Sequence, residues 1–205
     1  MGDTLFEIEA PPEPEQTAPK MTERQLLDAL HNKLDAEAQG NGGHRWIIAE
    51  HVRSSTGFDA RRTADALAID TWPSKGLELH GFEVKCSRSD WLAELRQPDK
   101  AEAFRRYCDR WWLVTSDRTI VRDDLPEGWG HMTMATQWVE RHVYMDVWRP
   151  EWRECRLGSD WARVPTTTLR RVKPAPKLAR EPVTRDMLAT IMRATAITAR
   201  RRGDA

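Results

Sequence analysis

Residues 81–87 read Gly-Phe-Glu-Val-Lys-Cys-Ser, and apolar and charged residues alternate along this stretch. Side chains alternate across a β-strand, so the pattern predicts a strand with one apolar face and one charged face. Glu83 and Lys85 share the charged face. Asp65 opens an earlier apolar stretch about 18 residues upstream of Glu83, which is the length of a strand, a loop and a returning strand. The sequence therefore predicts a hairpin that brings Asp65 beside Glu83.

Length and charge bound the class of protein. The chain has 205 residues, which suits one domain with a proper core and an appended tail. Its 32 basic and 32 acidic residues give a formal net charge of zero. The charges are unevenly distributed, because residues 1–20 are mainly acidic and residues 160–205 are mainly basic. This asymmetry indicates that one surface of the protein meets a polyanion.

Cysteine spacing and hydropathy exclude other classes. Cys86, Cys108 and Cys155 are single and widely spaced, so the sequence indicates neither a zinc ribbon nor a four-cysteine iron–sulfur cluster. No apolar run approaches the roughly 20 residues that a membrane-spanning helix needs, and the N-terminus lacks the pattern of a signal peptide. We therefore expect a soluble, cytoplasmic protein with no membrane partner.

Hydrophobic periodicity predicts the order of elements along the chain. Residues 1–20 are rich in proline and glutamate and are expected to form a disordered leader. The domain is expected over residues 21–174, and a linker with a basic C-terminal helix over residues 175–205, while residues 136–174 match no known pattern beyond one expected strand. Helices are predicted at residues 22–38 and 44–55, after Ser87 and at 183–202, and strands at 64–71, 77–86, 111–115, 129–135 and about 139–147. This order describes an α/β domain with a central mixed sheet flanked by helices.

The charged face of the hairpin has the residue types of a metal-dependent hydrolase. Two carboxylates that converge at one edge of a sheet cannot both stay ionised cheaply unless a cation lies between them. Hard oxygen ligands of this kind suit Mg²⁺ or Mn²⁺. Lys85 would lie next to that metal, where its ammonium stabilises charge on a phosphate or helps to orient or deprotonate a metal-bound water. The combination predicts phosphodiester hydrolysis.

A resemblance to a known family rests on these residues. Asp65, followed by Glu83-Val84-Lys85 on an adjacent strand, resembles the PD-(D/E)XK nuclease superfamily, although the superfamily's proline is replaced by Ala64. The resemblance covers roughly residues 44–135 and implies a restriction-endonuclease-like core. Within the superfamily the chain is most similar to the MmcB-like DNA repair proteins, on the residues Gly81 to Trp91, Pro98, Lys100, Asp109 to Val114 and Leu125 to Gly130.

The resemblance implies a role for each matched residue. Asp65 and Glu83 would ligate the metal, and the main-chain carbonyl of Val84 would add a further ligand. Lys85 would serve the attacking water and the scissile phosphate. Glu50, on the helix expected at residues 44–55, resembles the acid that some members add to the metal shell. Lys100 and Arg105, on the helix after the site, would contact phosphates of the DNA. The tail lies outside the resemblance, and its excess of arginine indicates that Arg200, Arg201 and Arg202 also contact DNA.

The expected function is a divalent-metal-dependent DNA nuclease acting in repair, recombination, or mobile-element or phage DNA processing. An isolated Glu-x-Lys tripeptide is common on charged surfaces, so a non-cleaving DNA-binding module that retains the nuclease fold is the alternative. Glu50 is equally well an ordinary helix residue. RNA stays open as a substrate, because phosphate chemistry is shared between the two nucleic acids. The C-terminal helix, with Met187, Leu188, Ile191 and Met192, serves either homodimer pairing or packing.

Overall fold

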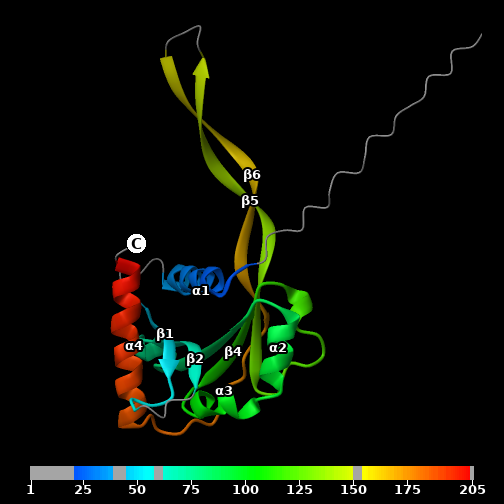
Figure 1. The fold of residues 1–205 in the computed structure, drawn as a ribbon. Helices are drawn as coiled ribbons and strands as arrows, with labels where there is room; N and C mark the ends of the chain where they lie inside the picture. Colours follow the sequence, from blue (N-terminus) through cyan, green and yellow to red (C-terminus); the bar gives the residue numbers. More distant parts are fainter. Residues whose placement is uncertain (1–20, 39–44, 58–61, 150–153, 204–205) are drawn as a thin grey trace, which may run out of the picture.

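Six strands form one mixed β-sheet in the order β1-β2-β3-β4-β5-β6 (Figure 1). The computed structural model describes residues 21–38, 45–57, 62–149 and 154–203, so the leader predicted over residues 1–20 lies outside the described residues. Neighbouring strands are antiparallel except that β3, β4 and β5 are parallel to one another. The strands are β1 (Trp46–Arg53), β2 (Thr63–Asp70), β3 (Leu79–Lys85), β4 (Arg110–Thr115), β5 (Trp129–Arg149) and β6 (Glu154–Lys173).

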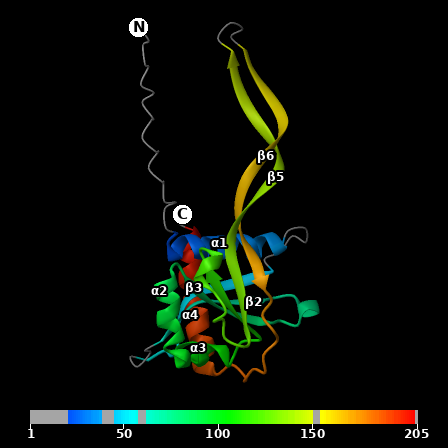
Figure 2. The ribbon, with the colours of Figure 1, turned by 90° about the vertical axis from the view of Figure 1, so that its right-hand side faces the viewer.

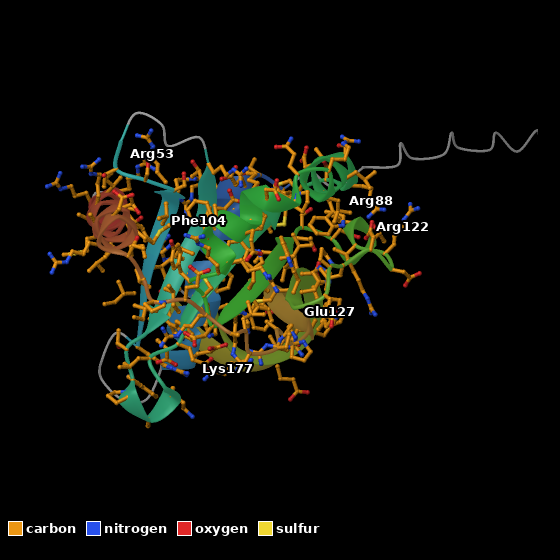
Figure 3. All side chains as sticks on the ribbon, turned by 90° about the horizontal axis from the view of Figure 1, so that it is seen from below. Arg53, Arg88, Phe104, Arg122, Glu127 and Lys177 are labelled. Atoms are coloured by element: carbon orange, nitrogen blue, oxygen red, sulfur yellow. The ribbon has the colours of Figure 1, made fainter. Side chains whose placement is uncertain are left out.

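Helices cover both faces of this sheet and one of its edges. The four α-helices of the described chain are α1 (Glu23–Ala38), α2 (Arg88–Leu95), α3 (Pro98–Arg105) and α4 (Arg185–Gly203), with short 3-10 turns η1 (Pro73–Lys75) and η2 (Arg118–Ile120). One apolar core lies between the sheet and α2, α3 and α4, and a second lies between the sheet and α1. Figure 3 shows Phe104 of α3 inside the fold and Arg53, Arg88 and Arg122 at its periphery. The architecture is therefore α/β, as the sequence predicted.

Local sequence signals account for the hairpin and the helix starts. Strands β2 and β3 pair antiparallel within about two residues of the predicted bounds. Ser87 begins α2 as expected, since its Oγ accepts a hydrogen bond from the Asp90 N–H at 3.2 Å. Helix α1 begins where the prediction of 22–38 placed it, and Thr22 and Gln25 form a capping box there, because the Gln25 N–H donates to Thr22 Oγ1 and the Thr22 N–H donates to Gln25 Oε1. These three predictions are confirmed.

The helix predicted at residues 44–55 is wrong, because this segment is the edge strand β1. The segment is rich in aromatic and β-branched residues, which favour strands, and it pairs antiparallel with β2. Its alternation is broken at His51, whose φ is +51°. Ala49 and Val52 consequently pack in one core while Ile48 packs in the other, so the apolar spacing imitates a helix.

Beyond residue 135 the structure departs furthest from the prediction. The two separate strands expected near 129–135 and 139–147 are one continuous strand, β5, and the sequence did not predict β6. The two strands pair from Met132 to Arg149 without a register shift. We call residues 134–149 of β5 and residues 154–169 of β6 the arm, since they extend past the rest of the sheet as a two-stranded ribbon (Figures 1 and 2).

Helix α4 lies beside the edge strand β1, near its predicted position (Figure 1). The Glu50 N–H donates a hydrogen bond to Thr198 Oγ1 at 2.9 Å, so α4 covers the free edge of the sheet. Met187 is buried and Ile191 packs against the core, whereas Leu188 and Met192 are exposed. Of the four apolar residues predicted to serve either homodimer pairing or packing, Met187 and Ile191 therefore serve packing within the chain. Among the described residues, none of the helices is long and apolar enough to span a membrane.

Candidate active site

The strand β3 presents Glu83 and Lys85 on the sheet face that α2 and α3 cover. Pairing between β2 and β3 stops at Ala66 and Phe82. Beyond that point Asp65 Oδ2 accepts a hydrogen bond from the Val84 N–H at 2.7 Å, which anchors the carboxylate of β2 to the backbone of β3. The structure thus brings Asp65, Glu83 and Lys85 together at the end of the hairpin.

Lys85 lies among three carboxylates. Its Nζ is 2.5 Å from Glu83 Oε1, 3.1 Å from Glu94 Oε2 and 4.0 Å from Asp65 Oδ2. A second lysine, Lys100 on α3, is 3.2 Å from Glu83 Oε1 and 2.8 Å from Glu94 Oε2. We call these five residues the carboxylate–lysine cluster. Three acids against two lysines leave the cluster with a surplus of one negative charge when all five are ionised.

Burial and mutual repulsion perturb the acids of the cluster. Burial, followed by the charge of Asp65, raises the pKa of Glu83 to about 8. Burial likewise raises the pKa of Asp65, although Lys85 opposes this. Burial alone would lower the pKa of Lys85, but the carboxylates of Glu83 and Asp65 outweigh it and raise that pKa above its ordinary value. Perturbations of this kind are typical of functional sites.

Sequence reasoning missed Glu94. This residue lies in the last turn of α2 and is buried. Its pKa is lowered, since the ammonium groups of Lys100 and Lys85 outweigh the effect of burial. Its second oxygen, Oε1, is buried and has no hydrogen-bond partner among the described residues. The one signal for this contact is Pro98, which begins a new helix and lets Lys100 fold back towards Glu94.

Glu50 lies elsewhere. It is on β1 rather than on a helix, and it is 4% exposed. Its carboxylate accepts two hydrogen bonds from Arg24, at 2.6 and 2.7 Å, and contacts His31 Nε2 at 2.9 Å. Burial would raise the pKa of Glu50, but these partners on α1 lower it well below its usual range. Since no described contact joins Glu50 to the cluster, its described interactions fasten α1 to the sheet.

The predicted DNA contacts are dispersed. Lys100 belongs to the carboxylate–lysine cluster, whereas Arg105 pairs with Glu102 at 3.0 Å on the surface of α3. Arg202 pairs with Asp28 of α1 at 2.9 Å, so the last turn of α4 lies against α1. Arg200 and Arg201 are exposed.

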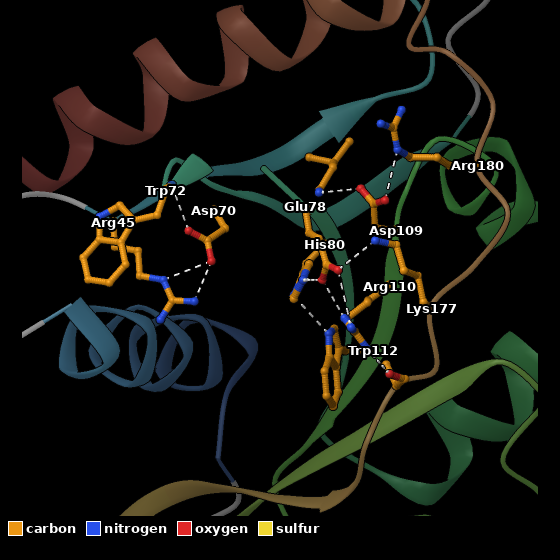
Figure 4. Close-up of polar contacts among 12 residues, drawn as sticks. Arg45, Asp70, Trp72, Glu78, His80, Asp109, Arg110, Trp112, Lys177 and Arg180 are labelled. Atoms are coloured by element: carbon orange, nitrogen blue, oxygen red, sulfur yellow. Dashed lines mark hydrogen bonds and ion pairs between the residues drawn. The ribbon is translucent and has the colours of Figure 1, made fainter. Parts of the chain in front are cut away.

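A separate polar network fastens the opposite end of β3 and β4 (Figure 4). Glu78 pairs with Arg110 at 2.7 Å and with Lys177 at 3.2 Å. Asp109 accepts hydrogen bonds from the Leu79 N–H at 2.9 Å and from Arg180 Nε at 3.0 Å. Lys177 and Arg180 follow β6, so the network ties the C-terminal segment to the sheet. Each acid here has its own basic partner, in contrast to the cluster.

The acids of the cluster suit a hard divalent cation. Within the described residues there is no group of three or more histidine, cysteine, aspartate or glutamate side chains arranged to hold a metal ion. Mg²⁺ keeps several waters and takes only one or two protein carboxylates, and Asp65 and Glu83 could provide these. Three acids against two lysines leave a surplus of negative charge when all five groups are ionised, and the buried Glu94 Oε1 has no hydrogen-bond partner among the described residues. The donor set therefore fits Mg²⁺ or Mn²⁺.

The chain was compared with protein-family models, with curated proteins and with solved structures, and none of these comparisons finds a match. The functional interpretation accordingly depends on the chemistry of the carboxylate–lysine cluster.

Proposed function

We propose that the protein is a divalent-metal-dependent DNA nuclease with a restriction-endonuclease-like core of the PD-(D/E)XK type, acting in the cytoplasm in repair, recombination, or mobile-element or phage DNA processing. The observation that carries the proposal is the buried convergence of Asp65, Glu83 and Lys85 at the end of the β2–β3 hairpin. A structural ion pair needs one acid for each base. Three acids share two lysines here, which favours a site that receives further positive charge.

Each residue of the cluster has a role in this proposal. Asp65 and Glu83 would hold Mg²⁺ or Mn²⁺, with the main-chain carbonyl of Val84 as a further ligand. The metal, when bound, supplies an activated water and positive charge for the phosphate. Lys85 presents a cation with three N–H donors, which suits contact with a non-bridging oxygen of the scissile phosphate. The Val84 N–H keeps Asp65 oriented.

Glu94 and Lys100 are positioning residues in the same proposal. Glu94 Oε2 lies within hydrogen-bond distance of both lysines, at 3.1 Å from Lys85 and 2.8 Å from Lys100. It therefore restricts the rotamers of Lys85, a side chain with four rotatable bonds. Lys100, on α3, contacts Glu83 at 3.2 Å and balances part of its charge.

A cleavage screen tests the proposal. Wild-type protein should cut at least one form of DNA among single strands, duplexes, flaps and four-way junctions, only when Mg²⁺ or Mn²⁺ is present. Lys85→Met should lower the rate about 100-fold or more, since one electrostatic donor contributes on that order to a transition state. Absence of metal-dependent cleavage of every substrate would overturn the proposal.

One observation favours a second candidate, a DNA-binding module that keeps the fold without cutting. Both lysines contact Glu83 Oε1, at 2.5 and 3.2 Å, so the acid has partners without a metal. Calorimetry with Mn²⁺ separates the candidates. No heat of binding, together with a DNA affinity that Glu83→Ala leaves unchanged, would favour the non-cleaving module.

A further inference from the structure

A groove lies between α1 and the base of the arm, on the face of the sheet opposite α2 and α3. It has a volume of about 660 Å³. Figures 1 and 2 both show α1 beside the point where β5 and β6 leave the sheet. Most of the side chains that line the groove carry hydrogen-bond donors, namely Asn32, Lys33, Thr167, Thr168, Arg170 and Arg171.

The groove has a surplus of positive charge. Lys33 pairs with Glu37 at 3.6 Å, which balances both charges. Arg170 donates to the neutral amide oxygen of Gln137 at 2.7 Å, and the guanidinium of Arg171 lies 5.2 Å from the ring centroid of Trp112. Within the part of the chain that the structure describes, neither arginine has an acidic partner. Two cations are therefore free to meet an anion.

The arm begins beside the candidate active site. Lys85 pairs with Thr115 across β3 and β4, and Thr115 pairs with Thr133 across β4 and β5. The arm starts at the next residue, so its origin is two strand spacings, or roughly 10 Å, from Lys85. The arm contains 16 residues of β5 beyond Thr133, and at 3.4 Å per residue this strand segment is about 54 Å long. The ribbon therefore extends from the end of the sheet that holds the cluster.

The described part of the arm is suited to nucleic acid. Trp138 is 61% exposed, and bases stack well on an exposed aromatic ring. A two-stranded ribbon also fits the major groove of DNA. In the sequence of the arm and the end of β6, the basic residues are Arg141, Arg149, Arg156, Arg163, Arg170, Arg171 and Lys173, against the acidic residues Glu140, Asp146, Glu154 and Asp160. The composition thus favours a polyanionic partner over a basic or neutral one.

We infer that the groove and the arm bind the phosphate backbone of the nucleic acid that the nuclease acts on, with Arg170 and Arg171 as phosphate contacts and Trp138 as a stacking platform. The inference rests on the proposed function and identifies its substrate-binding surface. The phosphate contacts of Arg170 and Arg171 would fix the position of the nucleic acid and carry no direct sequence information.

Fluorescence anisotropy with a labelled 30-base-pair duplex in EDTA tests the inference without any cleavage, over 50 to 200 mM KCl. The double variant Arg170→Gln/Arg171→Gln should reduce the slope of log K against log salt by about 1.8, which corresponds to roughly 60-fold weaker binding at 0.1 M salt. Trp138→Ala, a surface change, should weaken binding of a labelled single strand at least about fivefold. Lys177→Gln removes a charge from the exposed side chain at the opposite end of β3 and should change both affinities less than twofold.

The inference is overturned if the double variant binds the duplex with wild-type affinity and salt slope and Trp138→Ala binds the single strand as tightly as wild type does. It is also overturned if the wild-type protein binds neither probe. If wild type binds through the arm but cuts no DNA with Mg²⁺ or Mn²⁺, the proposed function fails and the inference stands. If wild type cuts DNA and the double variant binds and cuts equally well, the inference fails and the proposed function stands.

Discussion

Replacing Gly81 by alanine tests the packing that holds β3, and with it the candidate site, against β4. Gly81 pairs with Trp111 in the parallel register of these strands. A Cβ atom at Gly81 would overlap ring carbons Cζ3 and Cε3 of Trp111 and lie 3.1 Å from Cys108 Sγ. Trp111 is 0% exposed, and its ring centroid lies 5.8 Å from that of Trp129, so the indole has no free space to move into.

Overpacking of a well-packed core costs 1–3 kcal/mol and occasionally more, so Gly81→Ala should lose about 3 kcal/mol of the free energy of unfolding. With an m-value of about 2 kcal/mol/M, the urea midpoint should fall by about 1.5 M. Gly203→Ala is the matched control, because the added methyl group has no neighbour within 4 Å beyond the adjacent residues and the backbone of its own helix, and its midpoint should stay within about 0.3 M of the wild type. Unfolding is monitored by tryptophan fluorescence. If wild type and Gly81→Ala have equal urea midpoints, the described contact between β3 and Trp111 is refuted.

Three further predictions concern stability. Ser87→Ala removes the cap of α2 and should cost about 1 kcal/mol, seen as a thermal midpoint lower by about 2–4 °C; an unchanged midpoint would contradict the cap. The pKa of Glu50 is lowered in the folded state, so its stabilising contribution is complete above its unfolded pKa and is lost as the pH falls. Between pH 5 and 3, the Glu50→Gln variant should therefore lose less free energy of unfolding, measured with urea, than wild type does. Burial lowers the pKa of His131 to about 4, so wild-type stability should fall by roughly 3 kcal/mol as the pH drops from 6.5 to 4, whereas His131→Gln should lack this part of the dependence.

The sequence predicted the elements whose signals are local. The alternation of residues 81–87 predicted β3, and the apolar stretch that Asp65 opens predicted β2. The helix expected after Ser87 is α2, and the strand expected at residues 111–115 is β4. Glu83 and Lys85 share a face because of this alternation, and the hairpin spacing adds Asp65, because neighbouring strands of a hairpin bring their ends together. Their joint position in the fold was thus predictable, while their chemistry stays a prediction.

The remaining features depend on contacts between distant segments or on exceptional backbone geometry. The positive φ of His51 shifts the alternation of β1 and imitates a helix. Strand β6 contains Gly158 and Pro165, residues that disfavour strands. Pro165 is tolerated because β6 is an edge strand, which among the described strands pairs with β5 alone. Glu94 reaches Lys85 only through the packing of α2 on the sheet, which no periodicity records.

Nicking of supercoiled plasmid DNA in Mn²⁺ tests the central claim most directly, with Glu83→Gln as the site variant and Glu127→Gln, an exposed position, as its isosteric control. The proposed function predicts that wild type and Glu127→Gln convert the plasmid to its nicked form at the same rate, that EDTA stops both, and that Glu83→Gln is at least about 100-fold slower. Equal nicking by wild type and Glu83→Gln would contradict the role of the carboxylate–lysine cluster, and no nicking by wild type would contradict the proposed nuclease itself.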